Sequence, residues 1–125
     1  MKPITSEWVT KAEGDFATAR RELSAKDNPN YDAVCFHAQQ SAEKYLKAFL
    51  QETDIPFPRT HDLADLLDLA VSIEPTWTSM TADLNTLSAF AVEYRYPGDS
   101  AHLDDKEAFQ KCDAVRKIIR QALHL

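Results

Sequence analysis

The sequence predicts an all-α fold: an up-and-down bundle of about five helices, forming a single domain over residues 1–125. Three observations lead to this prediction. Six prolines divide the 125-residue chain into five segments, and proline is excluded from helix interiors. Each segment repeats apolar residues at spacings of three and four, which is the helical period. No stretch between turn signals alternates at period two, so we expect no sheet.

The first two predicted helices span residues 6–25 and 31–52. The apolar stripe of the first is Trp8, Ala12, Phe16, Ala19 and Leu23. The main stripe of the second is Val34, Ala38, Ala42, Tyr45 and Phe49. Residues 27–30 form the turn between the two helices, and residues 56–59, with two prolines, predict a stiff extended linker after the second.

Three shorter helices are predicted after the linker. The third spans residues 61–73, with Thr60 as its N-cap, and stops before Pro75. The fourth spans residues 79–94. The fifth opens with a capping box, Asp104 as N-cap and Glu107 three residues later, and its apolar stripe ends at Ala122.

Composition places the protein among folded cytoplasmic proteins. No apolar run approaches the roughly 18 residues that cross a bilayer, and the N-terminus is not a secretory signal. Cys35 and Cys112 lie far apart inside helical patterns, which favours buried thiols in a reducing compartment over a disulfide. The net charge of −6 argues mildly against nonspecific coating of nucleic acid but leaves room for a local basic site.

Several kinds of chemistry are excluded by the residues present. Two glycines cannot build a Gly-rich phosphate loop of either common type. No glutamate is followed three residues later by histidine, no two histidines are four apart, and Cys-x-x-Cys is absent. We therefore expect no metal site and no cofactor.

Two polar groups lie in the first half of the chain. The second predicted helix carries one on a broad side, namely His37, Gln40, Ser41, Lys44 and Lys47. The other is the run from Arg59 to Leu63, with His61 at the start of the third helix. The simpler interpretation is a solvated helix face in the first case and local helix capping in the second.

A third polar group lies in residues 94–102, where an arginine precedes and a histidine follows the pair Pro97 and Gly98. A guanidinium such as that of Arg95 can grip a phosphate through two hydrogen bonds and stabilise developing charge. An imidazole such as that of His102 can move protons near neutral pH. RNA needs no metal for cleavage because its own 2′-hydroxyl can attack. The alternative is that Arg95 caps helix carbonyls and His102 is a loop residue.

The order and spacing of three motifs resemble the HEPN (higher eukaryotes and prokaryotes nucleotide-binding) domain family over nearly the whole chain. The motifs are residues 36–48 (FHAQQSAEKYLKA), residues 61–63 (HDL) and residues 94–97 (YRYP). The resemblance implies a helical bundle that forms a homodimer. It also implies an Arg-x(4–6)-His motif, matched here by Arg95 and His102, that forms a composite metal-independent ribonuclease site across the dimer. Prokaryotic members often act as the toxin beside a minimal nucleotidyltransferase antitoxin.

Three functional hypotheses follow. In the first, the chain is a ribonuclease in which Arg95 binds the scissile phosphate and His102 transfers protons. In the second, it binds a nucleotide or a partner without catalysis, working with a nucleotidyltransferase. Candidate binding residues are His37, Gln40, Lys44, Arg59, His61 and Tyr96. The second hypothesis is favoured by Tyr96 and Pro97, because active ribonucleases of the family often have a polar residue after the arginine. A dimerising module without a ligand is the third possibility.

Overall fold

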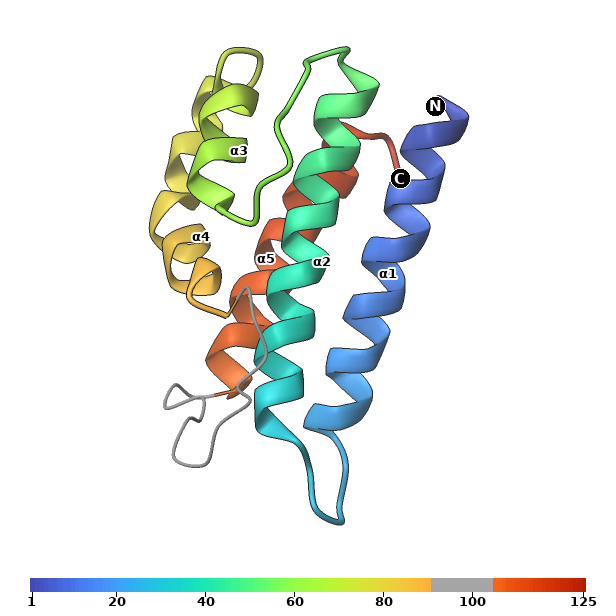
Figure 1. The fold of residues 1–125 in the computed structure, drawn as a ribbon, viewed down its shortest axis with the longest axis vertical. Helices are drawn as coiled ribbons and strands as arrows, with labels where there is room; N and C mark the ends of the chain where they lie inside the picture. Colours follow the sequence, from blue (N-terminus) through green and yellow to red (C-terminus); the bar gives the residue numbers. More distant parts are fainter. Residues whose placement is uncertain (91–104) are drawn as a thin grey trace.

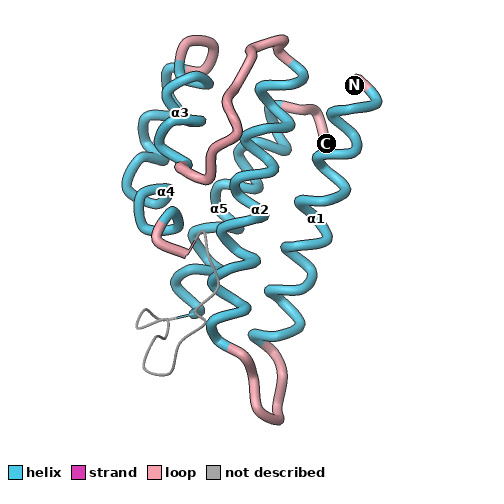
Figure 2. Tube along the Cα trace, in the orientation of Figure 1, coloured by secondary structure: helices cyan, strands magenta, loops and turns pink. Residues whose placement is uncertain are grey.

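The computed structural model describes residues 1–90 and 105–125. Its elements are α1 (Pro3–Leu23), α2 (Tyr31–Glu52), α3 (Leu63–Val71), the 3₁₀ helix η1 (Pro75–Met80), α4 (Thr81–Ser88) and α5 (Asp105–Ala122). The described residues contain no strand, and the tube in Figure 2 shows only helices joined by loops. The predicted all-α bundle is thus confirmed. Every helix in these two ranges is too short or too polar to span a membrane.

The bounds of α2 are those predicted, because Asn30 caps its first turn by accepting a hydrogen bond from the Ala33 amide at 3.1 Å. Helix α1 begins earlier than predicted, at Pro3, since proline is tolerated in the first turn of a helix. The predicted cap of α3 is wrong. Asp62, not Thr60, is the N-cap, and its carboxylate accepts from the Ala64 amide at 3.0 Å. His61 therefore lies outside the helix that it was predicted to open.

The predicted helix over residues 79–94 is shorter than expected. Pro75 starts the 3₁₀ helix η1, which buries Trp77 and Met80, and α4 then ends at Ser88. Residues 91–94, as well as the Asp104 cap predicted for α5, lie outside the described part of the chain.

Helix α2 is the centre of the bundle. It contacts α1, α3, α4 and α5, and Figure 1 shows it running between α1 and the shorter helices. Its own apolar residues, including Tyr45 and Leu46, join those of the other helices in one hydrophobic core. Cys35 and Cys112 are both buried in that core as thiols rather than joined in a disulfide, as the sequence predicts. Burial raises the pKa of the Cys112 thiol to about 12.

The connection from α2 to α3 positions the candidate site. It runs back alongside α2 before α3 begins (Figure 1), and Ile55 and Phe57 pack from it against the core. Its last residues lie beside the middle of α2, where the His61 imidazole meets Glu43. Glu43 and His61, which are 18 residues apart in the sequence, are therefore in contact.

A polar cluster joins α1, α2 and α5. The Glu13 carboxylate accepts two hydrogen bonds of 2.7 Å from the Arg116 guanidinium and a third from the Tyr45 hydroxyl. The Tyr45 oxygen also accepts from Arg120 at 3.1 Å. The Arg116 hydrogen bonds, with smaller contributions from Tyr45 and Arg120, lower the pKa of Glu13 from 4.5 to about 2. Burial and the Glu13 carboxylate raise the pKa of Tyr45 to about 12.

The depressed pKa of Glu13 makes stability depend on pH. Because the folded value of about 2 lies below the ordinary 4.5, the stabilisation is present above pH 4.5 and is lost as pH falls toward 2. We expect Glu13→Gln to be less stable than the parent at about pH 7 and to lose less stability over that acidic interval. Urea unfolding at several pH values measures both differences.

Glu7→Gln is the matched control, because Glu7 is an exposed residue of the same helix. Its free energy of unfolding should equal that of the parent protein at every pH. A Glu13→Gln protein with the parent's acid sensitivity would contradict the assigned role of Glu13.

Candidate functional site

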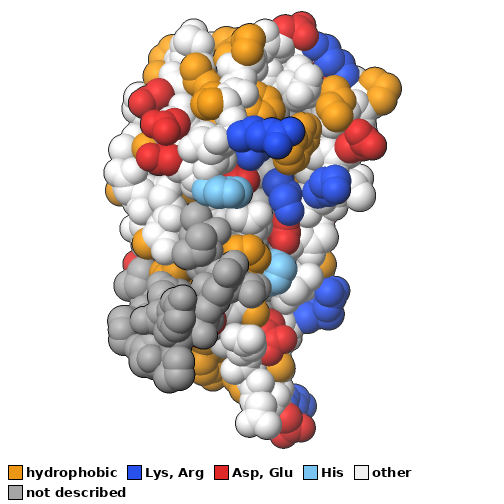
Figure 3. Space-filling view, viewed as in Figure 1, with side chains coloured by type: hydrophobic (Ala, Val, Ile, Leu, Met, Phe, Trp, Pro, Cys, Tyr) orange, Lys and Arg blue, Asp and Glu red, His pale blue; other side chains and the backbone are white. Residues whose placement is uncertain are grey.

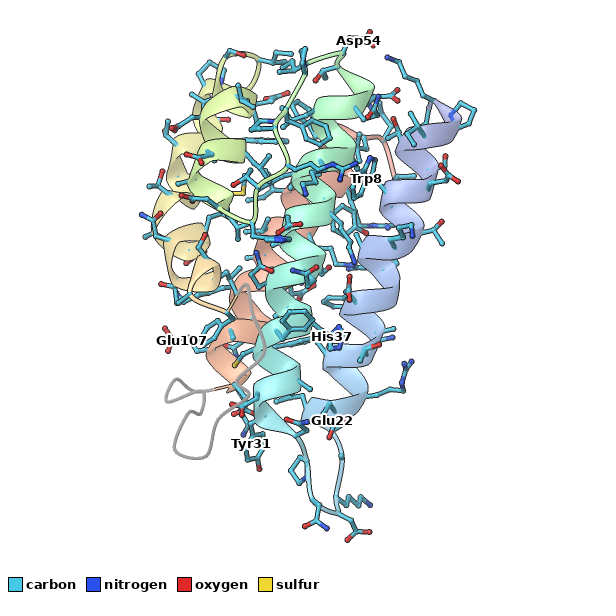
Figure 4. All side chains as sticks on the ribbon, in the orientation of Figure 1. Trp8, Glu22, Tyr31, His37, Asp54 and Glu107 are labelled. Atoms are coloured by element: carbon cyan, nitrogen blue, oxygen red, sulfur yellow. The ribbon has the colours of Figure 1, made fainter. Side chains whose placement is uncertain are left out.

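Two polar side chains of α2 bind one carboxylate of α1. The Nδ1 atom of His37 lies 2.7 Å from one oxygen of Asp15, and the Lys44 ammonium lies 2.5 Å from the other. Asp15 is largely buried between the two helices. Figure 4, in which His37 is labelled, shows the imidazole facing α1. The carboxylate thus fixes both side chains at the seam between α1 and α2.

A second carboxylate, one turn before Lys47 on α2, organises the neighbouring surface. Glu43 is only 3% exposed. One of its oxygens lies 3.0 Å from the Lys47 ammonium, and the other lies 2.9 Å from Nδ1 of His61. The Gln39 amide also donates to Glu43, at 3.3 Å. A buried carboxylate needs such partners because burying an unpaired charge is costly.

Gln40 extends this network. Its amide nitrogen donates to the Gln39 side-chain oxygen at 2.7 Å, and Gln39 in turn donates to the His61 carbonyl at 3.2 Å. The backbone of His61 and its imidazole are therefore both held by α2. These contacts place the end of the connection on the helix.

The Glu43 contact defines the chemistry available at His61. A carboxylate can only accept, so Nδ1 of His61 carries the hydrogen and donates it. The other ring nitrogen, Nε2, is then left for a ligand, and the His61 side chain is 64% exposed. Nε2 accepts a proton when the ring is neutral and donates a hydrogen bond when it is protonated.

These side chains share one surface, which we call the α2 face: His37, Gln40, Lys44, Lys47, Arg59 and His61. The space-filling view in Figure 3 shows Lys, Arg and His side chains gathered over the middle of this side of the molecule. Arg59 is exposed and makes no ion pair with the residues that the structure describes. The face therefore combines cations held by carboxylates with a guanidinium that none of the described carboxylates binds.

The structure brings together predicted residues from two separate sequence motifs. His61 joins Lys47 through Glu43, and Arg59 lines the same groove as both. The other predicted residues, Arg95, Tyr96 and His102, lie outside the described residues. No group of three His, Cys, Asp or Glu side chains within residues 1–90 and 105–125 is placed to hold a metal ion.

The sequence analysis did not identify Asp15, Glu43 or Trp8 as site residues. Glu43 lies four residues before Lys47, a spacing that predicts an ion pair, but only the fold shows that the pair is buried. Trp8 was assigned to the core stripe of the first helix and is instead half-buried, with Lys47 over its ring. Asp15 carries no recognisable signal.

Comparison with known proteins agrees with this architecture. The HEPN domain family matches residues 5–124, so the chain belongs to the HEPN domain family. A crystal structure of TT1696 from Thermus thermophilus has a similar fold, with a TM-score of 0.67 over 92% of each chain and 24% sequence identity. No curated protein matches the chain.

The Glu43–Lys47 pair provides a test of the site's construction. Replacing Glu43 by Gln keeps the shape of the side chain but leaves the buried Lys47 ammonium without its counterion, which should cost on the order of 3 kcal/mol. The double variant Glu43→Gln/Lys47→Met should be more stable than Glu43→Gln alone. Urea unfolding of the three proteins measures both effects.

Glu107→Gln is the matched control, because Glu107 is exposed and pairs with Lys111 at the same spacing of four. It should cost about 0.5 kcal/mol or less. Equal losses for Glu43→Gln and Glu107→Gln would show that the Glu43 pair is not an important buried contact.

Proposed function

We propose that this chain binds RNA on the α2 face and cleaves it without a metal ion, with Arg95 and His102 as the catalytic pair. The observation that carries the proposal is that the exposed Arg59 and His61 side chains lie on one surface with the carboxylate-paired Lys44 and Lys47. Phosphate is the anion that such Arg, Lys and His side chains bind in nucleic acids.

The location of the end of α4 supports this assignment. The Leu63 amide at the start of α3 donates a hydrogen bond of 3.0 Å to the Ser88 hydroxyl. The last residue of α4 therefore contacts the start of α3, two residues after His61 and beside the α2 face. The segment that carries Arg95 follows α4 in the sequence.

The proposed reaction is an intramolecular transesterification. The RNA 2′-oxygen attacks the neighbouring phosphorus while the bond from phosphorus to the 5′-oxygen breaks, giving a 2′,3′-cyclic phosphate and a 5′-hydroxyl. A general base takes the proton of the 2′-hydroxyl, and a general acid protonates the leaving oxygen. In a homodimer the two copies of His102 can divide these roles, while Arg95 stabilises the charge on the phosphate.

A second candidate function retains the α2 face without catalysis. In it the chain binds a nucleotide or a minimal nucleotidyltransferase. The residue pair Tyr96 and Pro97 after Arg95 favours this candidate. In the ribonuclease proposal the chain is the toxin and such a nucleotidyltransferase is its antitoxin.

RNA cleavage in excess chelator separates the two functions. We expect the parent protein to cleave single-stranded RNA, and we expect Arg95→Ala and His102→Ala each to lose roughly a hundredfold or more in rate. Arg21→Ala and His124→Ala are matched controls, because both residues are exposed and neither belongs to the proposed site; they should cleave like the parent.

Cleavage that survives in Arg95→Ala or His102→Ala would exclude those residues as the catalytic pair. Absence of cleavage by every protein, with RNA or nucleotide still bound, would favour the second candidate.

The composite site requires two copies of the chain. We expect light scattering to give twice the mass of the chain at the concentrations at which RNA is cleaved, because each copy supplies one Arg95 and one His102. A cleaving preparation that is monomeric at the same concentration would contradict a site shared between two copies.

A further inference from the structure

A groove of about 590 Å³ lies beside the α2 face. Its walls come from α1, α2 and the connection between α2 and α3. The residues that line it are Trp8, Lys47, Phe57, Pro58, Arg59, Thr60 and His61. Figure 4 labels Trp8 where α1 faces α2 and this connection. The groove is therefore continuous with the cationic surface, through Lys47, Arg59 and His61.

Aromatic rings form one part of the groove. The ring centroids of Trp8 and Phe57 are 6.3 Å apart, with an angle of 65° between the ring planes. Both side chains are half-buried, so each packs on the core and leaves part of its ring accessible. The Lys47 ammonium lies 5.5 Å from the centre of the Trp8 ring. Accessible aromatic rings of this kind stack on nucleobases.

Positive charge forms the other part. Arg59 is exposed, and among the described residues no carboxylate pairs with it. The contact of His61 with Glu43 leaves its Nε2 atom available toward solvent. A guanidinium and an imidazole next to aromatic rings match the two chemical parts of a nucleotide, a negatively charged phosphate and a flat base.

We infer that this groove binds one nucleotide of an unpaired RNA strand, with the base stacked on Trp8 beside the angled ring of Phe57 and a phosphate on Arg59 and His61. The inference rests on the proposed RNA function and adds the substrate class. A base in a duplex has neighbours on both of its faces, so only an unpaired base can stack on a protein ring. The protein thus selects single-stranded RNA.

Tryptophan fluorescence reports on the groove directly. The chain has two tryptophans, and the other, Trp77, is only 4% exposed, with its ring centroid 4.4 Å from that of Phe49. We expect single-stranded RNA to quench the emission of the His102→Ala protein, which prevents cleavage during the titration. The same RNA should leave the emission of Trp8→Phe/His102→Ala nearly unchanged, because only Trp77 then emits. A duplex of the same sequence should quench neither.

Affinity measured by fluorescence anisotropy in the same His102→Ala background tests the residues. Trp8→Leu should weaken the binding of a short single-stranded RNA roughly tenfold, because it removes the stacking of one base. Trp8→Phe keeps an aromatic ring and should retain most of the affinity. Arg59→Gln, an exposed substitution that leaves the core intact, should weaken binding about fivefold or more. Tyr31→Leu and Arg21→Gln are matched controls, because Tyr31 and Arg21 are exposed outside the groove.

The outcomes separate this inference from the proposed function. If Trp8→Leu and Arg59→Gln bind RNA like the parent while the parent cleaves RNA, the groove assignment is overturned and the ribonuclease stands. If the parent neither cleaves nor binds RNA, the proposed function is overturned. Quenching of Trp8 by AMP or ATP in that case would support a nucleotide site and overturn the RNA strand as its source. Equal affinity for duplex and single strand would overturn the selection for unpaired bases.

Discussion

The burial of α2 is the constraint on which the rest of the structure depends. The helix is contacted by α1, α3, α4 and α5, so polar side chains that it carries on several sides are removed from water. Gln39, Glu43 and Lys47 are all buried. Buried polar groups are generally satisfied within the protein. Here Gln39 and Glu43 hold His61 of the connection on the helix, and Tyr45 joins the helix to α1 through Glu13. The candidate site is a consequence of that requirement.

Three carboxylates in the bundle have the same role: each binds side chains from a neighbouring helix or from the connection. Glu13 binds Arg116 and Tyr45, Asp15 binds Lys44 and His37, and Glu43 binds Lys47 and His61. The first set joins α1, α2 and α5 and is half-buried. The other two reach the surface, where the side chains of His37 and Lys44 are partly exposed and that of His61 is exposed. A chain with a net charge of −6 therefore presents a local surface on which positive groups are held in fixed positions.

The sequence predicts the helices well because periodic apolar stripes and capping residues are local signals. The bounds of α2 follow from Asn30 and a long stripe. The predicted start of α3 was wrong because Thr60 and Asp62 are both good capping residues, and only the fold decides between them. The pairs Glu43–Lys47 and Glu107–Lys111 have the same spacing, yet Glu43 is buried and Glu107 is exposed. Tertiary packing alone makes that difference, so Glu43 could not be singled out beforehand.

The distribution of charge also explains why the groove would need aromatic rings to bind RNA. Lys44 and Lys47 are already neutralised by Asp15 and Glu43, so they contribute less to phosphate binding than unpaired lysines would. A protein that neutralises few phosphates releases few counterions, and its electrostatic affinity for RNA is correspondingly small. Stacking on Trp8, beside the angled ring of Phe57, supplies an interaction that does not depend on charge. A groove with one guanidinium, one exposed imidazole and two rings is consistent with recognition of a single unpaired nucleotide rather than of a long stretch of backbone.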